Sequence, residues 1–91
     1  MAFTQTEEME YLLIDMMFDS KPIEEFEKLW KDRTCDAGWS ELLHMSYCEQ
    51  SYISVGGDEG YLENPTIDHK RLAYLEKLIA FLEEKGIKEA K

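Results

Sequence analysis

Apolar residues recur at steps of three and four in four stretches of the chain, and this spacing predicts amphipathic helices. The third stretch keeps the period less cleanly than the other three. The four stripes are Met9, Leu12, Leu13, Met16 and Met17; Ile23, Phe26, Leu29 and Trp30; Trp39, Leu42 and Leu43, with Tyr47 and the polar Gln50 continuing the period; and Leu72, Leu75, Leu78, Ile79 and Leu82. The pattern predicts an all-α fold, an antiparallel four-helix bundle.

Short polar breaks mark the ends of the first two helices. The first is expected to span Thr6–Phe18, with a capping box formed by Thr4 and Glu7. The break "DSKP" ends it, and Pro22 fits the first position of the second helix. Glutamate and lysine one turn apart, Glu24 and Lys28, are expected to pair on that helix.

The later helix ends carry similar signals. The segment "DAG", residues 36–38, is expected to close the second helix, with Asp36 as the cap of a third helix over Trp39–Ile53. The last helix is expected to start at residues 64–66, where Asn, Pro and Thr are favourable. It should end before Gly86, a residue suited to the position after a helix.

The segment "VGGDEG", residues 55–60, separates the third helix from the fourth. Its glycines predict a flexible acidic loop. The segment lacks the Lys-Ser/Thr ending of a phosphate loop and the spaced acids and closing glutamate of a calcium loop. With 91 residues, the chain predicts a single domain over residues 1–91.

The charge balance narrows the possible partners. Twenty acidic residues against ten basic ones leave a net charge of −10. Such a protein repels nucleic acid and anionic membranes and attracts basic partners. The N-terminus has acids where a signal peptide has bases, and no apolar run reaches the length of a membrane span, so a cytoplasmic location is expected.

The acids are unevenly distributed along the chain. Residues 1–20 hold five acids, residues 36–65 hold six, and neither block contains Lys or Arg. Residues 21–35 and 66–91 are close to balanced. Solubility alone remains an alternative, but it is usually served by interspersed charges. The uneven distribution favours a directed electrostatic field.

The second acidic block contains a stretch rich in tyrosine, residues 46–65. It carries Tyr47, Tyr52 and Tyr61 among the acids Glu49, Asp58, Glu59 and Glu63. A solvated loop with its rings packed inward explains the tyrosines, but it does not explain thirty residues without a base. Tyrosine is enriched at protein interfaces, and acids pair with Lys or Arg of a partner. The stretch therefore predicts a protein interface.

Catalytic and metal-binding patterns are weak. His44 and Cys48 lie four residues apart and share a helical face, and Cys35 or His69 are further candidates in space. Neither the Cys-x-x-Cys spacing nor the His-Glu-x-x-His spacing occurs, and no nucleophile elbow is present. We expect no enzyme activity, no metal and no cofactor. The Met-rich first stripe is more typical of a core than of a binding face.

The stretch "LLIDMMFDSKPIEEFEKLWKDR" resembles the opening of the colicin D immunity protein family, the bacterial self-protective colicin-like immunity proteins. The shared features are an apolar first helix that ends before Ser20 and an amphipathic helix containing Glu25 and Phe26. A helix around Leu42, an acidic segment and a closing helix of the type "LEKLIAFLEE" follow in the same order. The resemblance covers residues 9–84, but the Gly56–Gly57 loop and the aromatic residues of 47–61 have no counterpart in it.

The resemblance implies a function. Family members are small helical proteins that neutralise a cognate toxin nuclease, either a colicin or the toxin of a contact-dependent inhibition system. In the colicin D case the toxin cleaves transfer RNA, and acids of the immunity protein stand in for RNA phosphates. The independent charge argument agrees, because a toxin that binds RNA presents a basic cleft.

The sequence therefore predicts a cytoplasmic immunity protein, a monomer when free, that binds a basic RNase toxin one to one. It is expected to bind neither nucleic acid directly nor a membrane. The expected partner-binding residues comprise four phosphate-mimicking acids, three packing anchors and two rim acids: Glu49, Asp58, Glu59 and Glu63; Tyr47, Tyr52 and Tyr61; and Glu41 and Asp36. Two alternatives stay open, a phage-encoded acidic nucleic-acid mimic that inhibits a host defence nuclease and a non-enzymatic helical adaptor that binds through its Met-rich first helix.

Overall fold

The structure is a computed structural model, and it describes residues 5–33 and 36–88. These residues form four α-helices and one short 3₁₀ turn, with no strand among them, so the all-α prediction is confirmed. The elements are α1 (Gln5–Phe18), α2 (Ile23–Lys31), α3 (Ala37–Ser54), η1 (Gly57–Glu59) and α4 (His69–Glu84). Thr4, the expected cap, and Cys35, a metal candidate, lie outside the described residues.

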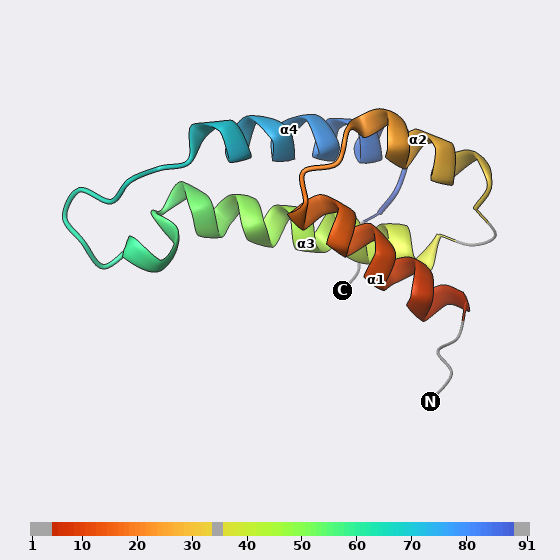
Figure 1. Cartoon of the computed structure of the whole chain (residues 1–91), viewed down its shortest axis with the longest axis horizontal. Helices are drawn as coiled ribbons and strands as arrows, with labels where there is room; N and C mark the ends of the chain where they lie inside the picture. Colours follow the sequence, from red (N-terminus) through yellow and green to blue (C-terminus); the bar gives the residue numbers. More distant parts are fainter. Residues whose placement is uncertain (1–4, 34–35, 89–91) are drawn as a thin grey trace.

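The helices form two layers (Figure 1). In one layer α1 packs against α3, and in the other α2 packs against α4. The layers meet where α3 and α4 run side by side in opposite directions (Figure 1). The turn around η1 extends past the layers at one end, and the molecule is elongated, with extents of 45 × 31 × 23 Å.

One hydrophobic core lies between the layers, and every helix contributes to it. Its buried members are Leu13, Met16 and Met17 of α1; Phe26 of α2; Trp39, Leu42 and Leu43 of α3; Leu75, Leu78, Ile79 and Leu82 of α4; and Ile87 after α4. Ser46 is also buried, and its hydroxyl donates to the main-chain oxygen of Leu42 at 2.7 Å. The apolar stripes thus predicted most of the core, but Leu12 is 45% exposed and does not belong to it.

Gly38 explains why α1 and α3 lie so close together. It sits in the first turn of α3, and a Cβ added to it would lie 3.1 Å from the main-chain nitrogen of Glu10 in α1. The prediction that "DAG" closes the second helix is therefore wrong: α2 ends at Lys31, and Ala37 begins α3. At this position the absence of a side chain allows two backbones to approach.

Aromatic and charged side chains order the corner between α2 and α3. The guanidinium of Arg33 lies over the ring of Trp30 at 3.5 Å and forms a 2.9 Å ion pair with Asp36. Asp36 occupies the predicted N-cap position, but its side chain makes no capping bond. Trp30 meets the buried Trp39 edge to face, with centroids 5.2 Å apart. The expected pair of Glu24 and Lys28 is absent from the ion pairs of the described residues.

Two helices end in Schellman motifs. At the end of α1, Ser20 has a φ of +55°, and the amides of Ser20 and Lys21 donate to the carbonyls of Met17 and Met16. At the end of α4, Gly86 has a φ of +79°, and Ile87 follows it into the core. The sequence predicted both helix ends within a residue.

The start of α4 differs from its prediction. The helix begins at His69, and the carboxylate of Asp68 caps it by accepting from the amide of Arg71 at 2.9 Å. Residues 64–66, where the helix was expected to start, are not helical, and neither are residues 67 and 68. The reason lies in Pro65, whose ring packs against Gly56 across the turn rather than opening a helix.

Two side chains of α4 fasten the turn between α1 and α2. The guanidinium of Arg71 donates to the hydroxyl of Ser20, and the phenol of Tyr74 donates to the main-chain oxygen of Lys21 at 2.6 Å. Burial raises the pKa of Tyr74 to about 12, with the charge of Glu25 also raising it and that of Arg71 opposing. No helix of the described residues is long and apolar enough to cross a lipid bilayer.

Candidate functional site: an acidic layer and its tip

The packing of α1 on α3 joins the two base-free blocks of the sequence. Residues 5–20 and 36–65 together carry eleven acids and no Lys or Arg. Since α1 packs against α3, the two blocks that carry these acids lie next to each other in the fold (Figure 1). We call α1, α3 and the turn of residues 55–66 the acidic layer. Residues 21–33 and 66–88, which contain α2 and α4, carry all nine bases of the described residues and eight acids.

The far end of the acidic layer, residues 52–63, forms a compact turn that we call the tip. The phenol of Tyr52, in the last turn of α3, donates to the carboxylate of Asp58 in η1. This hydrogen bond raises the pKa of Tyr52, and the negative charges of Asp58 and Glu49 add to the effect. Three of the expected site residues are therefore brought together here.

Glycines shape the backbone of the tip. Gly56 has a φ of +102° and is buried, and a Cβ added to it would lie 2.8 Å from Cγ of Pro65 and closer still to its Cβ. Gly57 also has a positive φ of +58°. The carboxylate of Glu59 accepts from the amide of Thr66 at 3.4 Å. Residues 55–66 thus form a turn closed by its own contacts.

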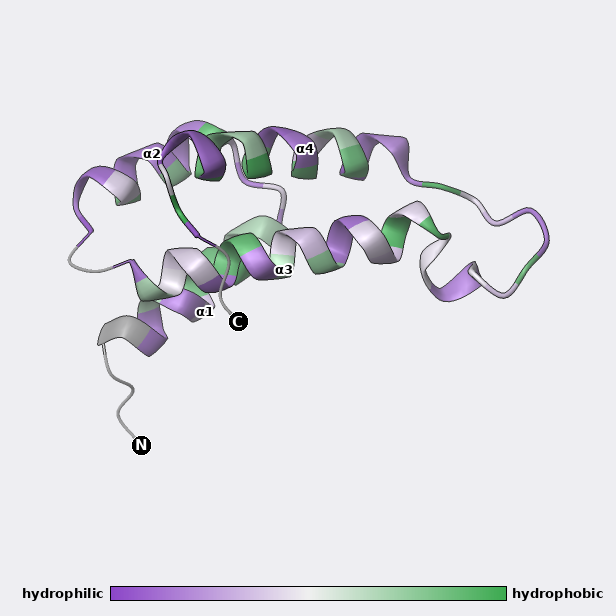
Figure 2. Cartoon of the chain, turned by 180° about the vertical axis from the view of Figure 1, so that it is seen from behind, coloured by the Kyte–Doolittle hydropathy of each residue, from purple (hydrophilic) through white to green (hydrophobic). Residues whose placement is uncertain are grey.

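Large apolar side chains surround the acids of the tip. Tyr61 is 85% exposed, Val55 is 63% exposed, and Tyr52 and Leu62 are each more than two-fifths exposed. Hydrophobic and hydrophilic positions alternate around this turn in Figure 2. Exposed aromatic and aliphatic groups among carboxylates suit an interface with a basic, partly apolar surface. Glu63 lies beside Leu62 and is exposed as well.

The structure does not bring all nine expected residues together. Asp36 lies at the opposite end of α3, about 27 Å away along an 18-residue helix, and its carboxylate pairs with Arg33. Tyr47 is half-buried and packs against the core. Glu41 is half-buried on α3, two turns before Glu49. Among the nine expected partner-binding residues, those of the tip therefore lie closest to one another.

Two features of this surface were not predicted from the sequence. Val55 and Leu62 flank the predicted acids and are exposed, and their position next to a glycine turn was the available signal. The acids of α1, such as Glu8 and Asp15, belong to the same layer as α3. No local signal in the sequence states which helices pair.

Among the candidate catalytic and metal-binding side chains outside the tip, His44 and Cys48 lie close together. Sγ of Cys48 lies 3.6 Å from Nε2 of His44 on the surface of α3. His69 lies at the start of α4. The described residues include no group of three or more His, Cys, Asp or Glu side chains placed to hold a metal ion. What the acidic layer offers is an extended negative surface with an apolar end.

Comparisons with protein-family models, with curated proteins and with solved structures return no match to this chain. The resemblance to the colicin-like immunity family therefore stays a prediction.

Proposed function

We propose that this protein is an immunity protein that binds a basic RNase toxin, of the bacteriocin or contact-dependent inhibition kind, and covers its RNA-binding cleft. The toxin is held one to one, in the cytoplasm, and its RNA substrate is a transfer RNA. The scaffold is an antiparallel four-helix bundle with an acidic loop, residues 55–60, between α3 and α4. The protein itself has no catalytic role.

The segregation of charge between the two layers is the observation that carries this proposal. The packing of α1 on α3 brings together two blocks that carry eleven acids and no Lys or Arg, and these blocks produce a field of predominantly one sign. A protein that binds RNA presents Lys and Arg along the path of the phosphates. Complementary potentials speed the encounter of such a pair and set their relative orientation.

The tip adds exposed aromatic and aliphatic side chains, which provide binding energy that charge alone does not. Carboxylates exposed to water contribute mainly to association rate, whereas buried aromatic and aliphatic anchors contribute most of the binding energy. Tyr61, Val55 and Leu62 are exposed in the free protein and lie beside Asp58 and Glu59. In the complex these three side chains pack against the toxin, and the acids around them replace RNA phosphates.

A pair of charge reversals tests the proposal against a matched control. The double variant Glu49→Lys, Glu59→Lys changes the acidic layer, and Glu83→Lys, Glu84→Lys makes the same change of net charge on α4. Protection of cells that express the toxin, and the salt dependence of binding, are measured for both. The first variant should lose protection and bind with a weaker salt dependence, while the second should protect like the parent.

The proposal fails if the first variant protects fully, or if both variants lose protection equally. Equal loss would mean that net charge alone, rather than the acidic layer, governs binding. The phage-encoded mimic makes the same electrostatic prediction but concerns a different nuclease, so the identity of the bound protein separates them.

The adaptor alternative lacks the exposure that it requires. Met16 and Met17 are buried in the core, and Met9 is half-buried. The three methionines are therefore not exposed as this alternative requires, and Leu12 is the one exposed member of the stripe.

A further inference from the structure

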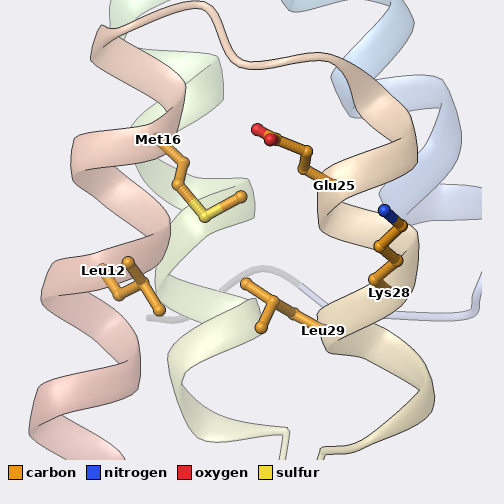
Figure 3. A pocket seen from close by; sticks show the side chains of 5 residues that line it. All are labelled: Leu12, Met16, Glu25, Lys28 and Leu29. Carbon is orange, nitrogen blue, oxygen red and sulfur yellow. The ribbon is translucent and has the colours of Figure 1, made fainter.

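A groove lies between α1 and α2, away from the tip (Figure 3). Leu12 and Met16 line it from α1, and Leu29 lines it from α2. Glu25 and Lys28 complete the lining, with the carboxylate of Glu25 extended towards α1 (Figure 3). Its volume is about 350 Å³, enough for a few aliphatic side chains.

The groove exists because α2 packs on α4 and α1 packs on α3, so the two helices face each other without filling the space between them. Leu12 belongs to the apolar stripe of α1, yet it is 45% exposed because no side chain of α2 covers it. An exposed leucine beside a buried methionine and a half-buried leucine makes a continuous apolar floor.

The rims of the groove carry mostly acids. On a helix, residues three or four positions apart lie next to each other. This spacing places three exposed acids beside Leu12 and Met16 on α1, and two acids and one arginine beside Leu29 on α2, where Lys28 also lines the groove: Glu8, Asp15 and Asp19; and Glu25, Asp32 and Arg33. An apolar floor between an acidic rim on α1 and a rim on α2 that includes Glu25 and Asp32 has the complementary pattern of a helix with an apolar stripe flanked by bases.

We propose that this groove binds a basic amphipathic helix of a partner protein. Apolar side chains of that helix, spaced at i, i+3, i+4 and i+7, enter between Leu12, Met16 and Leu29. Lysines and arginines on both sides of its stripe face Asp15 and Asp19 on one rim and Glu25 on the other. Met16, an unbranched and adaptable side chain, adjusts the floor to different partners.

The charge of the rims argues against a second copy of this chain as the occupant. Two molecules of net charge −10 would bring acidic rims together, and like charges in apposition oppose association. The proposal does not require the partner to be a nuclease, so it stands apart from the function proposed for the tip.

A synthetic peptide tests the groove directly. The probe is an amidated helix of leucine and lysine, about 18 residues or 27 Å long, with leucine at i, i+3, i+4 and i+7. One control peptide has the same composition in an order without a helical stripe, and another has glutamate in place of lysine. Binding to the whole protein is measured by fluorescence anisotropy at low and high salt. Only the first peptide should bind, and more weakly at high salt.

Variants locate the site. Leu12→Asn removes the exposed part of the floor and should weaken peptide binding about tenfold, which corresponds to about 1.4 kcal/mol of binding free energy. Asp15→Lys alters a rim without touching the core and should also weaken binding. Its matched control, Glu27→Lys, makes the same charge change on the other flank of α2. Val55→Asn at the tip should leave binding unchanged.

The proposal is overturned if the stripe-free peptide binds as well as the amphipathic one, or if Asp15→Lys and Glu27→Lys weaken binding equally. Both results would describe attraction of any polycation to an acidic protein. Self-association that Leu12→Asn abolishes would assign the groove to a second copy. Displacement of a fluorescent apolar dye from the groove without any peptide binding would assign it to small apolar molecules.

Discussion

Replacing Gly56 by alanine should destabilise the protein much more than replacing Gly86. Both glycines have a positive φ, at +102° and +79°, so alanine is strained at either position. They differ in their surroundings: a Cβ on Gly56 overlaps the ring of Pro65, whereas nothing lies within 4 Å of a Cβ on Gly86.

The expected sizes follow from this difference. A non-glycine residue in the left-handed region costs about 1–2 kcal/mol, and the lower entropy of the unfolded alanine chain returns about 0.4–1 kcal/mol. Gly86→Ala should therefore cost about 1 kcal/mol. Gly56→Ala carries the same cost and an overpacking penalty of about 1–3 kcal/mol, for a total of about 2–4 kcal/mol.

Urea denaturation followed by circular dichroism measures both free energies of unfolding. The variant Pro65→Gly removes the ring that Cβ of residue 56 would meet, so the double variant with Gly56→Ala should recover the steric part of the loss. A coupling free energy of about 1–3 kcal/mol is expected from the double-mutant cycle. If Gly56→Ala costs no more than Gly86→Ala, the turn does not pack on Pro65, and the reasoning is refuted.

Three further perturbations test the layers and the tip. Gly38→Leu should cost at least about 1–3 kcal/mol by forcing α1 away from α3, whereas Leu at the neighbouring exposed Ala37 should be close to neutral in the same urea titration. The pKa of Tyr74 is about 12 in the folded protein, above its ordinary value of 10. The phenol therefore stabilises the fold fully below pH 10, and this contribution decreases as the pH rises from 10 to 12. Tyr74→Phe should be less stable than the parent at neutral pH and should not show this decrease between pH 10 and 12. Asp58→Asn should lower the pKa of Tyr52 towards its ordinary value, observed by NMR titration of the ring, and an unchanged pKa would mean that the two side chains do not meet.

Periodicity predicted the helices and most of the core, because burial of one face leaves a direct trace in the order of residues. Leu13, Leu75 and Leu78 are buried as their stripes require. Leu12 has the same spacing and is exposed, because the width of the apolar face of α1 exceeds the surface that α3 covers. A pattern in one helix does not state how wide the neighbouring helix is or where it lies.

Glycine and proline were the least predictable residues. Gly86 ends α4 as expected, because the motif is local. A glycine such as Gly38 is typical of a helix end, but here it allows the backbone of α3 to lie close to Glu10 of α1, which is remote in sequence. Pro65 fits the first turn of a helix equally well, but its contact with Gly56 holds it outside α4. In both cases a tertiary contact decided between two local conformations.

The sequence predicted which types of residue make up the candidate site, but it predicted their places in the fold only in part. The sequence contains the count of acids in each block, but the meeting of residues 5–20 with residues 36–65 depends on helix pairing. Asp58 and Tyr52 are close because a glycine turn folds back on the end of α3. Asp36 belongs to the same base-free block and lies at the other end of the helix. Blocks of charge therefore indicate a surface, and the fold determines its extent.

Co-purification of the protein with the product of the adjacent gene, followed by an RNase assay of the mixture, tests the proposed inhibition most directly. The proposal predicts a one-to-one complex that weakens at high salt and has no RNase activity, while the neighbouring protein alone cleaves transfer RNA. Glu49→Lys, Glu59→Lys should restore cleavage, and Glu83→Lys, Glu84→Lys should not. A neighbouring RNase that remains active in the presence of this protein, or a complex indifferent to both variants, would contradict the proposal.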